Sequence, residues 1–97
     1  MDDTPTPSCL STPGQLGPLV RAQRKGQGLR IDDAAALLGV SVDLLSRLEN
    51  GQGTVRLDKL VAVLDGLGLA LIVAAKTDPL VQNLQRQASG AAGKPSA

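Results

Sequence analysis

The polar side chains between Gly39 and Gly51, in "GVSVDLLSRLENG", are of the types that hydrogen-bond to nucleic acids. Apolar residues at helical spacing separate them, so a helix would carry them on one face. Such a helix meets base edges in the major groove through its first residues. We predict base contacts from four residues of this helix: Val42, Asp43, Ser46 and Arg47. An acid accepts from a cytosine amino group, and an apolar side chain touches a thymine methyl.

Two short helices joined by "LGVS" must position these side chains as a helix-turn-helix. Gly39 suits the left-handed conformation at the end of one helix, and Ser41 can cap the next. Leu45 and Leu48 are predicted to anchor the second of these helices in the core. The acids Asp32 and Asp33 favour a helix N-terminus, so we interpret them as capping residues rather than a catalytic pair.

Two further helices and one strand are predicted around this motif. The first helix should follow a turn at 13–16 and run regularly from about Pro18 to Lys25, because an internal proline removes a donor. The fourth should carry an apolar stripe formed by Leu57, Leu60, Val61, Leu64 and Leu67. A strand at 69–75, with Leu69, Leu71, Ile72 and Val73 at its centre, needs a partner edge. A second copy paired about a two-fold axis is the simplest partner, although the stretch could instead extend the fourth helix.

Composition limits the alternatives. The 97 residues contain no aromatic side chain and no His, and Cys9 is the single cysteine. A core without aromatics is marginal at this size, which favours a dimer. No apolar run is long enough for a membrane span, and a lone cysteine favours a cytoplasmic protein. The sequence predicts no metal, no cofactor and no catalytic site, since it lacks a Gly-rich phosphate loop and the cysteine lies in a tail.

Three regions are expected along the chain: a disordered leader at 1–12, a DNA-binding and dimerisation domain at 13–76, and a flexible tail at 77–97. Residues 15–76 carry eight Lys/Arg against six Asp/Glu. Within the tail, Leu80, Val81 and Leu84 could form one or two amphipathic turns, which alone would be marginal.

Residues 13–76 closely resemble the Cro-like (XRE) helix-turn-helix family, on "GVS", "RLENG" and "TVRLDKLVAVLDGLGL" followed by a hydrophobic strand. Within that family they are most similar to HipB-type antitoxins. The resemblance implies an all-α, lambda-repressor-like domain of four to five short helices whose C-terminal strand completes an intersubunit sheet in a homodimer. It also implies a repressor that acts on its own operon, binds operator DNA in the bacterial nucleoid, and binds a HipA-like kinase toxin.

Particular residues acquire roles from this resemblance. Arg24 and Glu49 match an ion pair between the first helix and the end of the third, which we interpret as structural. Asn50 matches a phosphate-contacting position. The full set of predicted phosphate contacts is Arg21, Arg30, Ser41, Asn50, Gln52 and Arg56, with Arg47 able to reach either a base or a phosphate.

The sequence departs from the family where it would read DNA. Positions 42–44 are usually Gln, Arg, Ser or Thr, and here they are Val, Asp and Leu. Asp43 would be repelled by phosphates, and Val42 with Leu44 could instead contact a protein. The alternative function is therefore a dimeric partner-binding protein that has lost DNA binding.

Overall fold

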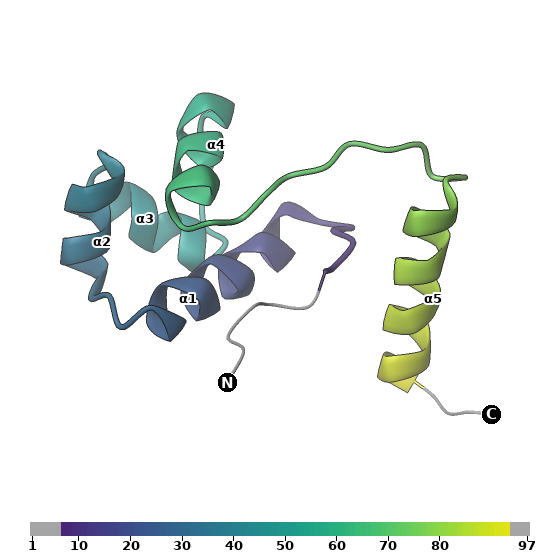
Figure 1. The fold of residues 1–97 in the computed structure, drawn as a ribbon. Helices are drawn as coiled ribbons and strands as arrows, with labels where there is room; N and C mark the ends of the chain where they lie inside the picture. Colours follow the sequence, from purple (N-terminus) through teal and green to yellow (C-terminus); the bar gives the residue numbers. More distant parts are fainter. Residues whose placement is uncertain (1–6, 94–97) are drawn as a thin grey trace. The chain divides into compact units, whose positions relative to one another are not determined.

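A computed structural model describes residues 7–93, with side chains to residue 86 (Figure 1). The predicted leader is therefore described only from residue 7, and residues 1–6 and 94–97 lie outside the described part. Residues 11–71 form one compact unit, and residues 72–93 with 7–10 form a second.

The first unit contains four α-helices: α1 at Leu16–Gly26, α2 at Ile31–Leu38, α3 at Val42–Glu49 and α4 at Leu57–Gly66. A short 3-10 turn at Pro13–Gln15 precedes α1. The helices enclose an aliphatic core formed by Leu16, Val20, Ala34, Ala35, Leu45, Leu48, Val63, Leu64 and Leu67. The all-α fold with four to five short helices agrees with the sequence prediction.

Helix α1 begins two residues earlier than predicted. Pro18 is the third residue of α1. The first four N–H groups of a helix have no partner within that helix, so the missing donor of Pro18 costs no intrahelical hydrogen bond.

Helix α4 carries a different buried face from the predicted one. Val63 is fully buried, whereas Leu57 and Val61 are exposed. Leu64 and Leu67 do face the core, as predicted. The prediction was wrong for the N-terminal half of the helix. There, no other element of the described chain covers Leu57 and Val61.

Helix α1 holds the end of α4 through two glutamines. The side-chain amides of Gln23 and Gln27 both donate to the Leu67 carbonyl, at 2.9 and 2.8 Å. Gly68 follows with φ of +81°, which ends the helical path. The alternative in which residues 69–75 extend this helix is therefore wrong.

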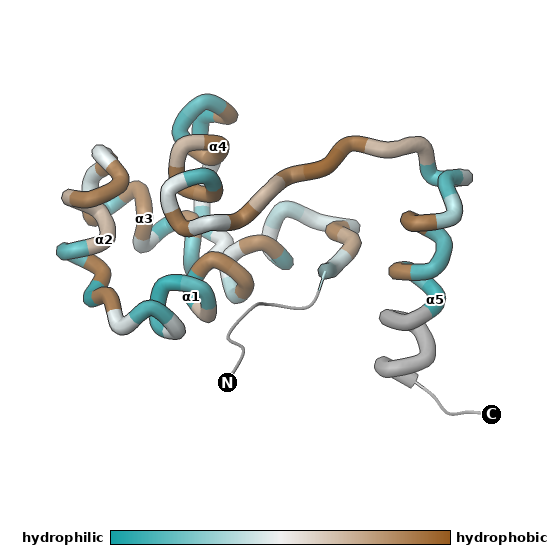
Figure 2. The backbone as a smooth tube through the Cα atoms, viewed as in Figure 1, coloured by the Kyte–Doolittle hydropathy of each residue, from teal (hydrophilic) through white to brown (hydrophobic). Residues whose placement is uncertain are grey.

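Residues 69–75 adopt no regular secondary structure in the single chain, and no strand occurs among residues 7–93. Figure 2 shows the apolar run that follows α4. Ile72 and Val73 are 71% and 93% exposed. Consecutive large apolar side chains that are this exposed to solvent often mark a surface that a partner covers.

The second unit contains helix α5 at Pro79–Gly93. This helix is longer than the one or two turns predicted. Asp78 caps it, since its carboxylate accepts from the Leu80 N–H at 2.9 Å, and Pro79 takes the first helical position. Cys9 donates weakly from Sγ to the Val81 carbonyl at 3.7 Å. None of the described helices is both long and apolar enough to traverse a lipid bilayer.

Candidate nucleic-acid interface

The turn between α2 and α3 has the predicted conformation. Gly39 ends α2 with φ of +72°, a left-handed value that glycine adopts without a steric penalty. Ser41 is the cap of α3, and its hydroxyl accepts from the Leu44 N–H at 3.0 Å. This hydrogen bond starts α3 at a fixed residue, which defines the residues of its first turn.

The inner face of α3 is fixed by Leu45 and Leu48, both buried. The first turn therefore leaves Val42 and Asp43 exposed to solvent. Ser46 and Arg47 are half-buried one turn further on. The four predicted base-reading residues consequently lie on helix α3 away from its two core leucines, as a recognition helix requires.

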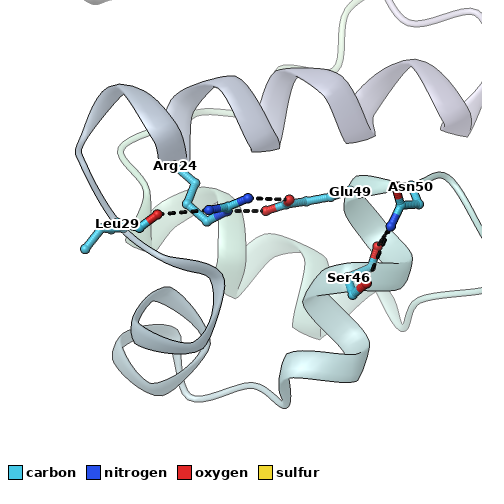
Figure 3. Close-up of polar contacts among 5 residues, drawn as sticks. All are labelled: Arg24, Leu29, Ser46, Glu49 and Asn50. Carbon is cyan, nitrogen blue, oxygen red and sulfur yellow. Dashed lines mark hydrogen bonds and ion pairs between the residues drawn. The ribbon is translucent and has the colours of Figure 1, made fainter.

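A buried ion pair joins α1 to the end of α3 (Figure 3). Arg24 donates from Nε and Nη2 to the two carboxylate oxygens of Glu49, at 2.6 and 2.9 Å. Its Nη1 donates to the Leu29 carbonyl at 2.9 Å. The hydrogen bonds that Arg24 donates to Glu49 raise the pKa of Arg24, against the lowering effect of burial. Both residues are less than 9% exposed, so this charged pair fixes the angle between the two helices.

Asn50 closes the C-terminal end of α3 in a way that competes with its predicted phosphate contact. Its side-chain amide donates to the Ser46 carbonyl at 2.8 Å (Figure 3). Its backbone N–H donates to the same carbonyl at 3.0 Å. The amide nitrogen also lies 3.4 Å from Ser46 Oγ, and an amide has two N–H groups, so a phosphate contact would replace only this longer bond.

Arg47 lies between α3 and the loop that follows it. Its Nε donates to Asp43 Oδ2 at 3.0 Å, four residues earlier on the same helix. Its Nη1 donates to the Thr54 carbonyl at 3.1 Å. Gly53 has φ of +66°, and an added Cβ there would lie 3.4 Å from Nη1 of Arg47. Arg47 thus lies against the loop, held by two hydrogen bonds, instead of extending into solvent.

Two other predicted phosphate-binding arginines pair with neighbouring acids. Arg30 Nε lies 3.5 Å from Asp32, and Arg56 Nη2 lies 3.1 Å from Asp58. All four side chains are more than half exposed. Exposed pairs of this kind contribute ~0–1 kcal/mol, so a phosphate can displace the acid at little cost. Arg21 and Gln52 are also exposed and accessible to a ligand.

Sequence reasoning missed the partners of these arginines. The spacing of Asp43 and Arg47 is i, i+4, a helical ion-pair signal that could have indicated their contact. No comparable signal indicates Thr54, because it contributes a backbone carbonyl. Among the described side chains, no group of three or more His, Cys, Asp or Glu residues is arranged to hold a metal ion.

Residues 15–75 match the family model of the helix-turn-helix domain, which is more than half of the chain. This chain belongs to the helix-turn-helix domain family. A curated relative, the uncharacterized HTH-type transcriptional regulator y4mF of Sinorhizobium fredii (strain NBRC 101917 / NGR234), is 38% identical over 66 residues. The match spans 68% of this chain and 87% of that relative.

Two solved structures have a similar fold. A chain in the structure of the HipA-HipB-O2-O3 complex aligns with a TM-score of 0.64 and 20% identity, over 72% of this chain and 99% of that one. The MDT Protein aligns with a TM-score of 0.62 and 20% identity, over 70% and 96%. The helix-turn-helix domain of this chain therefore has the all-α part of the fold expected from its resemblance to HipB-type proteins, whereas the expected C-terminal strand is not formed among the described residues.

Proposed function

We propose that this protein is a sequence-specific DNA-binding transcriptional repressor that acts as a homodimer. The proposal rests on the way in which helix α3 is held and exposed. It is capped by Ser41 and anchored by Leu45 and Leu48, and it leaves the first-turn residues Val42 and Asp43 exposed. A helix docked through its N-terminal residues is the geometry with which helix-turn-helix proteins read the major groove. The curated relative, described as a transcriptional regulator, supports the same function.

The proposed phosphate contacts surround α3 in the chain: Arg21, Arg30, Ser41, Asn50, Gln52 and Arg56. They set affinity and salt dependence, whereas sequence choice comes from base contacts. The deciding experiment measures binding of the full chain to the DNA upstream of its own gene, against a scrambled duplex, over a range of salt concentrations. The absence of binding to either duplex at low salt would leave the partner-binding alternative, which the exposure of Val42 favours.

Arg21→Gln is expected to make the salt dependence of binding less steep. Each phosphate contact adds about 0.9 to the slope of log K against log salt, so losing one contact in each half of a dimer reduces the slope by about 2. Arg86→Gln removes the same charge from helix α5 and serves as the control. Equal slopes for the two variants would show that Arg21 does not bind phosphate.

The dimer is proposed to form through a strand at 69–75, paired antiparallel with its copy. The support is the apolar run Leu69, Leu71, Ile72 and Val73, much of which is exposed in the single chain. A two-stranded ribbon alone is marginal, so further apolar surface must be buried with it. Val61 and Leu57 on α4 are exposed apolar residues available for that purpose.

Ile72→Pro and Val73→Pro should shift the protein to monomers. Alternate residues of an antiparallel strand donate across the pair, so at least one of these prolines removes a ladder hydrogen bond. Ile72→Thr keeps the β-branch and the N–H group and should remain dimeric. Light scattering at matched concentrations reads the mass directly, and dimers in both proline variants would refute the strand.

We further propose that the protein is the antitoxin of a toxin–antitoxin operon, regulates that operon and binds a HipA-like kinase. The similarity in fold to a chain of the HipA-HipB-O2-O3 complex supports this. Helix α5, with Leu80 exposed, is the proposed segment for the partner. Co-purification of the full chain with the product of the adjacent gene tests the proposal, and truncation after Thr77 tests the role of the helix.

A further inference from the structure

Asp43 and Arg47 form a pair whose geometry differs from that of the other exposed pairs of the helix-turn-helix unit. The side chain of Asp43 is 81% exposed, while that of Arg47 is 38% exposed. Arg47 is held from two sides, by Asp43 Oδ2 at 3.0 Å and by the Thr54 carbonyl at 3.1 Å. Arg47, which has the longer and more flexible side chain, is therefore the restrained residue of the pair. Asp43 is the residue that remains accessible to a ligand.

The restraint on Arg47 limits what it can contact. Its guanidinium also lies beside Gly53, where an added Cβ would be in van der Waals contact with Nη1 at 3.4 Å. Reaching a base would break its bonds to both Asp43 and Thr54. An arginine fixed in this way has already lost much of its rotamer freedom, which makes it well suited to hold a neighbour in one orientation.

The effect on Asp43 is both geometric and electrostatic. Asp43 is the second residue of α3, within the first turn that meets base edges. Arg47 engages one carboxylate oxygen and offsets the negative charge that phosphates would repel. The remaining lone pairs of the carboxylate can still accept a hydrogen bond. The pairing with Arg47 thus reduces the repulsion between the Asp43 carboxylate and DNA phosphates, and it orients the carboxylate as a hydrogen-bond acceptor.

Among the bases, cytosine fits such an acceptor best. It presents an amino donor in the major groove, whereas guanine presents two acceptors. Adenine also has an amino group, but its neighbouring N7 is an acceptor that a carboxylate would repel. We propose that Asp43 is the specificity-determining residue for a cytosine in each half-site, and that Arg47 is the positioning residue that orients and neutralises it. This inference rests on the proposed DNA-binding function.

The experiment selects from a library of DNA duplexes with a randomised central segment, using the full chain. The wild-type protein should enrich cytosine at one position of each half-site, by about tenfold or more over adenine. Asp43→Asn should change that preference to adenine, because an amide both accepts from N6 and donates to N7. Asp43→Ala should remove the preference at that position and leave the others unchanged. Since Asp43 is exposed, both variants should fold, which thermal melting checks.

Arg47 is tested at the same base position. Arg47→Gln should weaken the cytosine preference there, while Arg47→Lys, which keeps a cation beside Asp43, should retain part of it. A change of preference at a different, guanine position would show that Arg47 reads a base itself and would overturn its assignment. A purely structural role would lower affinity for all sequences without moving any single preference.

The outcomes separate this inference from the function on which it rests. If the wild-type protein enriches no sequence, the proposed repressor function fails, and the inference fails with it. If the wild-type protein enriches a sequence, and both Asp43→Asn and Asp43→Ala keep the wild-type base preferences, the DNA-binding function stands. Only the role of Asp43 is then refuted.

Discussion

Glu49→Ala is expected to lower the free energy of unfolding by about 3–5 kcal/mol, because it leaves the guanidinium of Arg24 buried without its counter-charge. Arg24 is 7% exposed, and two of its donors point at the Glu49 carboxylate, so solvent cannot replace the lost partner without a rearrangement. Small domains are stable by only about 5–15 kcal/mol, and this loss would remove a large part of that margin. Urea unfolding at a fixed protein concentration measures the change, since dimerisation would otherwise alter the apparent stability.

Two further variants separate the charge from the packing. Glu49→Gln keeps an oxygen that can accept from Arg24 and should lose less stability than Glu49→Ala. The double variant Arg24→Met with Glu49→Leu removes both charges and should recover most of the loss, because a buried ion pair is often no more stable than apolar residues of similar volume. A double variant as unstable as Glu49→Ala would mean that the stability comes from packing around the pair rather than from balanced charge.

The local elements of this fold follow from local sequence signals. Gly39 and Ser41 each act within one turn of the chain, so their residue types predict the helix end and the cap that the structure contains. Leu45 and Leu48 are likewise placed by helical periodicity alone. The Arg24–Glu49 contact joins residues 25 positions apart, and only the resemblance to a family indicated it before the structure.

The features that the sequence did not predict depend on contacts with backbone or on long-range neighbours. Gln23 and Gln27 donate to the carbonyl of Leu67, and a backbone acceptor leaves no residue-type signal. Arg47 donates to the carbonyl of Thr54, and this contact was not predicted because its acceptor is also a backbone atom. Leu57 and Val61 were predicted to be buried and are exposed. An apolar residue at helical spacing does not reveal whether another element covers it.

Gly17 is the strongest example of a role that sequence reasoning missed. It lies buried in α1, where α1 crosses the C-terminal end of α3. A Cβ added there would lie 2.7 Å from the Leu48 carbonyl oxygen, 2.9 Å from the Glu49 carbonyl carbon, and nearer still to the Glu49 oxygen. These are backbone atoms, which cannot rotate away as a side chain can. The residue type alone does not indicate a helix crossing, whereas in the structure the absence of a side chain at Gly17 permits a close one.

Gly17→Ala is therefore expected to destabilise the protein, even though alanine is the better helix former by about 1 kcal/mol. Overpacking in a core typically costs about 1–3 kcal/mol, and a clash with backbone belongs at the upper end of that range because α1 and α3 must move apart. That movement also separates Arg24 from Glu49, so the loss should exceed the gain in helix propensity. Thermal unfolding should show a fall in Tm of several degrees, at ~4–8 °C for each kcal/mol in a domain of this size.

Gly26→Ala is the matched control, since it makes the same change in the same helix where an added Cβ meets nothing within 4 Å. This variant should be as stable as the wild type or slightly more stable, because only the helix-propensity effect remains. The difference between the two variants isolates the cost of the helix crossing from the effect of the residue type. Equal stability of Gly17→Ala and Gly26→Ala would contradict the close approach of α1 to α3, and with it the fixed angle at which α3 is held for DNA.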